Sequence, residues 1–598
     1  MSKKTSFFQA RVNDFSRQTE ALQTQYNTIS FYRITGFMVF AFFVIWSLSQ
    51  SNFMLFFILS GTFFIAFGLL VRYHNRIKRD MELCQKIHEI NDEEISRLRH
   101  AFGNLYGGDE FIDEKHPYTS DLDVFGRNSL FQLINRAGTH QGILTLKSWL
   151  THFSSKPEIE SRQQMVTELM PLVDWRQKIQ AYSRKEHVKK ENEHTLNTWL
   201  QGKDFIGSNV FYKIIPYVMI SFSLILITAV FYELIYDSFL FLPLFITGYF
   251  LYKIRDYSRK TYEMTDSGIK TLESVEQMLL SVERQNFSHE QLTRLKNQLS
   301  SKGLVASQKI KELRKILEWL NLRGNMIYHI FNLFFLLDYI FLAKAEKWRK
   351  DFGNEIASWF NTIAEFEALN SIAAFAFANE GFVFPEIMDN PYIFTAENLG
   401  HPLIPEDKRI HNDFDFSGKG KTCIVTGSNM AGKSTFLRTV GVNAVLAFAG
   451  APVCADSMEV SQFLIFSSMR TKDNLEENIS SFYAELLRLK MLLEKIQDGV
   501  PVFYLLDEIL KGTNSVDRHI GAESLILQLN KSNAFGLVST HDLELGKLSE
   551  QNNLITNFNF SSSIIGEEIV FDYKLQPGIC KSTNASQLME KIGIQIKS

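Results

Sequence analysis

The stretch that decides the fold of the C-terminal part of the chain reads TCIVTGSNMAGKST and spans residues 422–435. It contains the pattern G-x-x-x-x-G-K-[ST], formed by Gly427, Gly432, Lys433 and Ser434. An apolar strand-like run precedes the loop, and a helical pattern, FLRTVGVNAVLAF, follows it. This order of strand, loop and helix is the context that a phosphate-binding loop requires. The stretch therefore predicts an α/β nucleotide-binding domain.

The residue types of the loop indicate how it would bind ATP. Backbone N–H groups of the loop and of the following helix cradle phosphate oxygens. We expect the Lys433 ammonium to reach the β- and γ-phosphates and the Ser434 hydroxyl to bind Mg²⁺. The predicted ATP-binding residues are Gly427, Ser428, Asn429, Met430, Ala431, Gly432, Lys433, Ser434 and Thr435.

Two further apolar runs end in polar residues. VFYLLDE (502–508) ends in a carboxylate pair, and AFGLVSTHD (534–542) ends in Thr-His-Asp. Ligands of α/β sheets bind at the carboxyl ends of strands, so these residues are expected beside the loop. Asp507 is placed to hold Mg²⁺. Glu508 is the candidate general base, and His541 is expected to contact the γ-phosphate or the attacking water.

Length and composition bound the remaining possibilities. The chain has 598 residues, which suggests several domains, and its 45% hydrophobic content excludes a wholly disordered protein. Its formal net charge of −3 excludes a uniformly basic nucleic-acid binder. The four cysteines are widely scattered, with no zinc-site spacing and no disulfide framework.

Phenylalanine is unevenly distributed. Of the 52 Phe residues, 18 lie in the windows 31–71 and 211–252. A bilayer-spanning helix needs about 20 apolar residues. The runs 53–71 and 214–232 meet that length, and the other run in each window is shorter and depends on its flanks. Each window therefore predicts a transmembrane helical hairpin.

Basic residues bracket both windows. Arg33 and Arg72 bracket the first pair of apolar runs, Lys213 and Lys253 bracket the second, and the turns within the pairs carry no Lys or Arg. By the positive-inside rule, we expect a multi-pass protein of the inner (cytoplasmic) membrane with its ATPase domain in the cytoplasm. Buried apolar hairpins in a soluble protein are the alternative. The first 30 residues are polar, so no cleaved signal peptide is expected.

A third apolar run, at 326–343, carries polar residues near its middle. These are His329, Asn332 and Asp338. A central Asp costs about 2.5–3.5 kcal/mol on membrane-insertion scales. A fifth crossing would also place the nucleotide site outside the cell. We therefore expect this run to form a buried core helix.

The motifs together resemble one family. TGSNMAGKST (426–435), LLDEILKGTNSVD (505–517) and STHD (539–542) are similar to the ATPase domain of the MutS family of mismatch-repair proteins. Asn-Met-Ala within the loop is more specific than the general phosphate-loop pattern. Upstream, residues 121–150 resemble the start of the family's helical core, and residues 360–378 resemble its last lever helix.

The resemblance implies an ABC-class ATPase that works as a homodimer. In such a dimer each ATP site is completed by the partner's signature segment, which DNLEENISSFYAEL (473–486) resembles. Ser480 and Ser481 would then approach the γ-phosphate bound by the other subunit. A helix N-cap is an equally good interpretation of either serine taken alone. Leu510-Lys511 stands where the family usually has Gly-Arg.

The resemblance also implies a DNA-directed function related to mismatch repair, now at a bilayer. Residues 1–117 leave no room for the family's mismatch-reading domain, so mismatch specificity is doubtful. The alternative is a membrane-associated regulatory or remodelling ATPase without DNA binding. An ABC transporter is a weaker reading, because no S-G-G-Q-like signature is present. Six basic residues between 296 and 315, the basic strip, could face DNA, lipid or solvent.

We therefore expect a multidomain protein. An α-helical core and lever region would carry two transmembrane helical hairpins, and an α/β P-loop ATPase domain of the ABC class would follow. The expected segments are an N-terminal cytoplasmic segment (1–30), transmembrane hairpin 1 (31–72), a helical linker (73–117), the MutS-like helical core (118–210), transmembrane hairpin 2 (211–253), lever- or clamp-like helices (254–390) and the ATPase domain (391–598).

Overall fold

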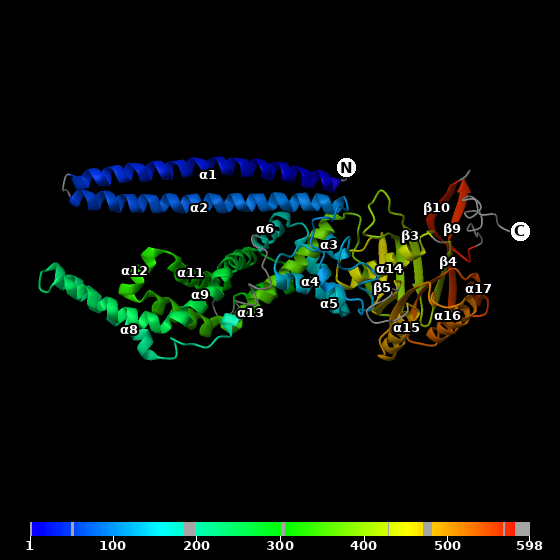
Figure 1. Ribbon diagram of the computed structural model, residues 1–598. Coiled ribbons are helices and arrows are strands. Elements are labelled where there is room, and N and C mark those ends of the chain that lie inside the picture. The colour runs from blue at the N-terminus through cyan, green and yellow to red at the C-terminus, as the bar shows by residue number, and fades with distance from the viewer. Residues whose placement is uncertain are drawn as a thin grey trace. The chain divides into compact units, whose positions relative to one another are not determined.

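The chain folds into two compact units, each assembled from separate pieces of sequence (Figure 1). Unit 1 consists of Met1–Asp92, Ala137–Ile143 and Leu172–Ala368, and unit 2 of Glu93–Arg136, Leu144–Pro171 and Leu369–Ser598. The computed structural model describes residues 3–49, 53–184, 198–300, 305–428, 430–470, 481–565 and 568–580. The seven consecutive segments expected from the sequence stay a prediction.

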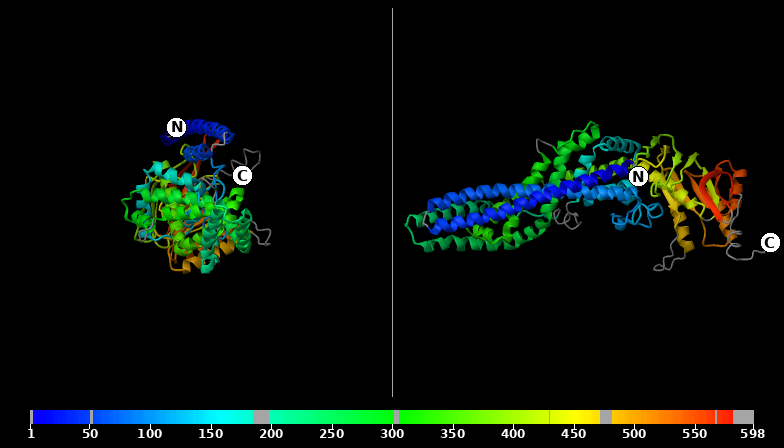
Figure 2. Two further views of the ribbon diagram at one scale, coloured as in Figure 1. Left: turned by 90° about the vertical axis from the view of Figure 1, so that its left-hand side faces the viewer. Right: turned by 90° about the horizontal axis from the view of Figure 1, so that it is seen from above.

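Two long helices open the chain. α1 (Lys3–Ser49) and α2 (Phe53–Leu98) lie side by side (Figures 1 and 2). The rings of Phe40 and Phe63 stack between them, with centroids 3.8 Å apart. Both helices run without interruption through the expected hairpin boundaries at residues 30 and 72. The apolar window of each helix has none of its residues buried, so these side chains face outward.

A second helical group surrounds the other apolar window. It consists of α8 (Val210–Phe231), the short 3₁₀ helix η2 (Asp237–Leu240), α9 (Phe241–Arg284), α12 (Met326–Phe335) and α13 (Leu337–Ala378). α12 packs against both α8 and α9. The expected two-helix hairpin is therefore joined by a third helix in unit 1.

The expectation of one buried helix over the third apolar run is wrong in two respects: the helix is broken, and part of it is exposed. Leu336 has a left-handed backbone with a φ of 51°, and the chain bends by 84° there, so the run is divided between α12 and α13. The burial of Asn332 and Asp338 is confirmed. Ile330 and Phe331, however, are 52% and 51% exposed.

Both expected apolar windows lie in helices of membrane-spanning length. Among the described residues, four helices are long and apolar enough to cross a membrane, and the bent pair of α12 and α13 would make a fifth if it were one span. The four are Lys3–Ser47, Phe56–Leu98, Val210–Phe231 and Asp237–Glu263. The other longer helices before residue 378 are α4 (His140–Thr151), α5 (Lys156–Leu169), α6 (Val173–Ser183), α10 (Glu290–Gln298) and α11 (Ala306–Asn321).

Unit 2 contains the predicted α/β domain. Its larger sheet has the strand order β10-β9-β4-β8-β7-β6, and a smaller sheet has the order β1-β5-β2-β3. The larger sheet is formed by β4 (Thr422–Gly427), β6 (Leu464–Ser468), β7 (Val502–Asp507), β8 (Ala534–Thr540), β9 (Ile555–Ile565) and β10 (Glu568–Pro577). The smaller sheet is formed by β1 (Glu386–Met388), β2 (Ile393–Leu399), β3 (Asn412–Ser417) and β5 (Ser457–Ser461).

The pairing of the larger sheet explains its sequence pattern. β9, β4, β8, β7 and β6 pair in parallel, and only the β10 pairing is antiparallel. Every residue of β4, β7 and β8 is buried, as continuous apolar runs in parallel sheets require. The accompanying helices are α14 (Lys433–Phe448), α15 (Ser481–Gln497), α16 (Ser515–Leu529) and α17 (Leu543–Gly546).

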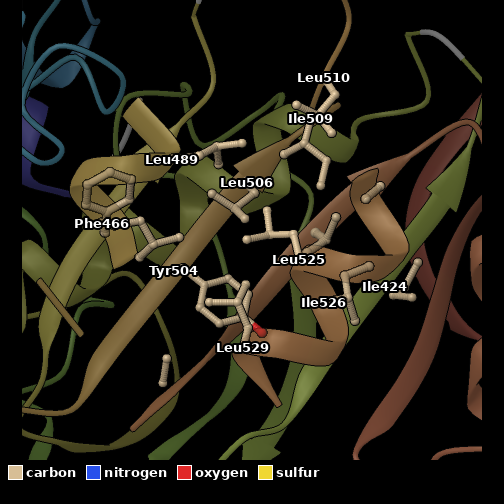
Figure 3. Packing of buried hydrophobic residues seen from close by; sticks show 14 of the residues in the cluster. Ile424, Phe466, Leu489, Tyr504, Leu506, Ile509, Leu510, Leu525, Ile526 and Leu529 are labelled. Carbon is tan, nitrogen blue, oxygen red and sulfur yellow. The ribbon is translucent and has the colours of Figure 1, made fainter. Parts of the chain in front are cut away.

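A hydrophobic cluster fixes β7 against its helices (Figure 3). Leu506 of β7 packs in the same cluster as Leu489 of α15 and Ile526 of α16. Burying each such side chain contributes about 1.5–3 kcal/mol. Tyr504, also buried, shares a 2.7 Å hydrogen bond with the Thr422 hydroxyl of β4. These contacts hold the carboxyl ends of the central strands in place.

Candidate nucleotide-binding site

The predicted phosphate loop connects β4 to α14. Lys433, the first residue of α14, donates from Nζ to the backbone carbonyls of Gly427 and Ser428, each at 3.0 Å. Its ammonium therefore lies inside the curve of the loop, where phosphate oxygens would take over those contacts. Burial lowers the pKa of Lys433. Met430, at the tip of the loop, is 84% exposed.

The strand order brings the second and third motifs to the same edge. β8 lies between β4 and β7, with Thr540 opposite Thr426 and Ser539 opposite Asp507. The buried Asp507 carboxylate accepts a hydrogen bond from the Ser539 hydroxyl. The polar residues that follow these strands therefore gather beside the phosphate loop, as expected.

Two side-chain nitrogens contact the Glu508 carboxylate. Its Oε1 lies 2.5 Å from Nε2 of His541, and its Oε2 lies 3.1 Å from Nζ of Lys511. The hydrogen bond from His541, aided by Lys511 and opposed by partial burial, lowers the pKa of Glu508 to about 2. Nε2 of His541 also lies 3.5 Å from Nζ of Lys433. The predicted catalytic residues and the predicted phosphate-binding lysine thus meet in one place.

A cavity of about 440 Å³ adjoins this group. Its wall includes the phosphate loop from Met430 to Phe436 together with Glu508. The rest of the lining comes from the end of β2, the segment after it, the start of β3 and the last two strands, with Leu399, His401, Ile404, Lys408, Ile410, Asn412, Phe560 and Tyr573. A cavity lined by apolar and aromatic groups with a polar end suits a nucleotide base and its phosphates.

Tyr573 of β10 was not among the predicted site residues. The register of β10 shifts between Phe571 and Leu575, and Tyr573 itself has a φ of 52°. The side chain of Asn412 fixes this bulge by donating to the Tyr573 carbonyl at 3.1 Å and accepting from the Leu575 N–H at 2.8 Å. A Cβ on Gly432 would lie 3.1 Å from the Tyr573 ring, so the ring closes over the loop.

His401 lines the cavity and has a structural role there, not a catalytic one. Burial, with a smaller effect of nearby arginines, lowers its pKa to about 3. Its Nδ1 accepts the backbone N–H of Leu403 at 3.1 Å. The imidazole therefore stays neutral at physiological pH and shapes the turn after β2.

A buried carboxylate joins α15 to the loop after β7. Glu485 of α15 accepts a hydrogen bond from the backbone N–H of Leu510 and a second from that of Lys511. Leu510 has a left-handed backbone with a φ of 60°, and burial raises the pKa of Glu485. Because Lys511 contacts Glu508, the Glu485 carboxylate positions the loop that holds the candidate general base.

Several predicted residues lie where the structure gives no side-chain detail. Asn429 and Ser480 lie outside the described residues, and Ser481 opens α15 without a described side chain. The trans-signature assignment therefore stays a prediction.

The described residues fit ATP and Mg²⁺. The buried Ser428 hydroxyl has no hydrogen-bond partner among the described residues, as expected of a donor that awaits a phosphate oxygen. Within the same part of the chain, no group of three His, Cys, Asp or Glu residues could hold a metal ion. Mg²⁺ does not need one, because it binds through one or two protein oxygens, waters and substrate phosphates. Ser434 and Asp507 are the candidate protein ligands.

Comparisons with known proteins agree with this geometry. The family model of MutS domain V matches residues 423–595. A DNA mismatch repair protein MutS from Chlorobium phaeovibrioides is 30% identical over 239 residues, which is 39% of this chain and 27% of the relative. Another from Ehrlichia chaffeensis is 32% identical over 238 residues, which is 39% of this chain and 28% of the relative.

A third relative carries a different name. The Endonuclease MutS2 of Bacillus velezensis is 28% identical over 210 residues, covering 35% of this chain and 26% of the relative. The chain thus matches about a quarter of the length of these curated relatives. The matched segment contains the phosphate loop, the Asp507–Glu508 pair and His541. The similarity to the MutS family therefore lies in the C-terminal part of the chain, over residues 423–595 for the family model.

Proposed function

We propose that this protein is a membrane-anchored ATPase of the MutS type, with an ABC-class P-loop site that binds and hydrolyses ATP. One observation carries the proposal. The phosphate loop, the Asp507–Glu508 pair and His541 follow three neighbouring parallel strands, and the loop and Glu508 line one cavity of about 440 Å³.

The geometry suggests a role for each group. The Lys433 ammonium exchanges the carbonyls of its own loop for the β- and γ-phosphate oxygens of ATP. The Glu508 carboxylate, ionised and oriented by His541, accepts a hydrogen bond from the attacking water and then its proton. Mg²⁺, held by Ser434 and Asp507, would neutralise charge on the phosphates.

A homodimer completes the proposed cycle. In this arrangement Ser480 and Ser481 of one subunit would reach the γ-phosphate bound by the other. ATP binding closes the dimer and hydrolysis opens it. Glu485 gives the signature helix α15 a direct connection to the loop that carries Lys511. A movement of α15 on closure of the dimer would thus shift the loop next to Glu508.

Anchoring rests on the two pairs of apolar helices. Their outward side chains are unusually exposed for a water-soluble surface: Ile45 is 70%, Phe57 69% and Phe245 78% exposed. Exposed apolar surface on this scale marks a membrane or protein contact. Uncharged runs bracketed by basic residues favour the bilayer. We therefore place α1, α2, α8 and α9 across the membrane, with the ATPase domain in the cytoplasm.

α13 is the candidate lever between the nucleotide cycle and the second hairpin. Glu346 of α13 accepts the backbone N–H groups of Phe205 at 2.9 Å and Ile206 at 3.1 Å, just before α8 begins. Arg349, one turn further, lies 2.6 Å from Asp204. α13 contributes residues to both units, so a movement of its C-terminal part would reach the entrance of the hairpin.

The target of the cycle has two candidates. The names of the curated relatives favour DNA as a partner. The basic strip favours the alternative, a regulatory or remodelling ATPase of the membrane without DNA binding. Lys296 donates to a backbone carbonyl at 2.7 Å, and Lys309 lies 2.9 Å from Glu312. Arg314 lies 2.8 Å from Glu276. Half of the strip is thus already engaged within the protein.

An ATPase assay with DNA separates these candidates. The detergent-purified protein would be assayed with and without duplex DNA across a salt series. A protein that makes 6–10 phosphate contacts loses about 10³–10⁵ in affinity between about 50 and 200 mM salt. DNA-stimulated hydrolysis with that salt dependence supports the DNA-directed function. If DNA does not change the rate of hydrolysis and no salt-sensitive binding is found, the result supports the membrane function instead.

A further inference from the structure

The segment between α11 and α13 leaves the helical bundle and returns to it. Before this excursion, Trp319 of α11 stacks on Phe341 of α13, with ring centroids 5.2 Å apart. At positions further along both helices from the excursion, the indole N–H of Trp348 in α13 donates to the Lys309 carbonyl of α11 at 2.9 Å. α11 and α13 therefore run together, and the chain enters and leaves the excursion on the same side. This arrangement argues against α12 and α13 as a continuous membrane span.

The buried carboxylate on the inner side of the excursion is paired. Asp338 is 1% exposed on its side chain, and its two oxygens bind Arg323 at 3.0 Å and the Tyr328 hydroxyl at 2.8 Å. Its backbone N–H donates to the Asn332 side chain at 2.9 Å. A buried carboxylate that is paired and hydrogen-bonded in this way can lie beside hydrocarbon, where an unpaired one could not.

The end of α12 is closed by the second hairpin. The last carbonyls of a helix have no partner within that helix. Here the Ser223 hydroxyl of α8 donates to the Phe334 carbonyl at 3.3 Å, and the Thr247 hydroxyl of α9 donates to the Leu333 carbonyl. The Leu336 N–H binds the Asn332 carbonyl at 2.9 Å. The break at Leu336 therefore leaves these backbone groups satisfied without water.

The outer side of α12 is apolar. Met326 is 80% exposed, and Ile330 and Phe331 are about half exposed. Phe245 of α9, the helix against which α12 packs, is also exposed. The exposed His329 lies near the start of α12, where headgroups and water can hydrate it. The outward residues of α12 thus extend the apolar surface of the second hairpin.

We infer that residues 322–340 form a re-entrant membrane element, with α12 embedded in the lipid of the leaflet on the ATPase side. The inference rests on the proposed membrane anchoring of α8 and α9. It makes the membrane region five helices, of which four span the bilayer. Asp338 lies at the start of α13. The same helix therefore contacts both the re-entrant element, through Asp338, and the residues just before α8, through Glu346 and Arg349.

Site-specific fluorescence in proteoliposomes tests this inference. Variants of the full chain with one introduced cysteine would carry the NBD fluorophore, in a Cys84→Ser background because the other three native cysteines are buried. Phe331→Cys probes α12, Phe245→Cys is the matched position in the hairpin, and Lys315→Cys and Asp351→Cys lie on exposed positions of α11 and α13. Brominated phosphatidylcholine reports lipid contact, and external dithionite reports which side of the vesicle a probe faces.

We expect lipid quenching at Phe331 of at least half that at Phe245, and equal bleached fractions for Lys315 and Asp351. Quenching at Phe245 but not at Phe331 would place α12 outside the bilayer and overturn the inference alone. Complementary bleached fractions for Lys315 and Asp351 would show a full span and also overturn it. An unquenched Phe245 would overturn the anchoring itself, and the inference with it.

Discussion

The nucleotide site and the second hairpin use apolar and charged residues in opposite ways. In unit 2 the apolar strands are buried, and the charged groups Lys433, Glu508 and Lys511 gather at the edge where the strands end. In the hairpin region the apolar side chains face outward, and the charged Asp338 is buried with its partner. The contrast fits the surroundings that we propose for the two regions, water in one and lipid in the other.

The largest expected effect removes the carboxylate at the exposed edge. Glu508→Ala should lower the rate of ATP hydrolysis by about 10²–10⁴, the usual contribution of a positioned general base. ATP binding should remain, because Lys433 and the loop are unchanged. Steady-state hydrolysis and fluorescent-nucleotide binding measure the two effects. Glu494→Ala, an exposed change on α15, is the matched control. Hydrolysis at the normal rate would show that Glu508 is not the base.

The next effect concerns the buried carboxylate of the hairpin region. Asp338→Ala leaves Arg323 without its partner, which costs about 3 kcal/mol, the lower end for a broken buried pair because Arg323 is 21% exposed. The thermal unfolding midpoint in detergent should fall by several degrees. Asp351→Ala, at an exposed position of the same helix, should leave it unchanged. Equal midpoints for the two variants would mean that the ion pair adds nothing to the fold.

A smaller effect tests whether α15 positions the catalytic loop. Glu485→Ala leaves the buried Leu510 N–H without an acceptor, at a cost of about 1–3 kcal/mol. We expect kcat to fall about tenfold, with KM for ATP little changed, because the loop and not the phosphate site is disturbed. Glu485→Gln keeps an acceptor oxygen and should recover most of the rate. A change in KM alone would contradict the positioning role.

The smallest effect is a shift in the pH profile. The hydrogen bond from Lys511 helps to lower the pKa of Glu508, so Lys511→Ala should move that pKa upward toward its ordinary value. Activity that depends on the ionised carboxylate would then be lost at a higher pH as the solution is acidified. The acid limb of the pH–rate profile measures this shift. Lys490→Ala, at an exposed position, is the control. A shift of the acid limb to lower pH in Lys511→Ala would contradict the prediction.

The nucleotide site was predictable because its motifs are local. A buried strand followed by a glycine-rich loop, or by Asp507 and Glu508, is visible in a few consecutive residues. Tyr573 could not be found in this way, since it reaches Gly432 only through the bulge of β10. No pattern in the consecutive residues around Tyr573 indicates where its ring points.

The hairpin region was predictable only in part. Composition indicated the apolar helices, because length and hydropathy depend on the run alone. The break at Leu336 depends on its left-handed backbone and on the side chain of Asn332, which an apolar pattern does not reveal. The partners of Asp338 lie on three different elements, so only the folded chain shows that the charge is neutralised.

The central claim is that one chain joins a MutS-type ATPase to a membrane anchor. The most direct test expresses the full chain, washes the membranes with alkaline carbonate, floats the vesicles on a density gradient and measures ATP hydrolysis in the floated fraction. We predict that the protein floats and hydrolyses ATP, and that Glu508→Ala floats equally but loses this activity. Protein released by the wash, or floated activity that survives Glu508→Ala, would contradict the account.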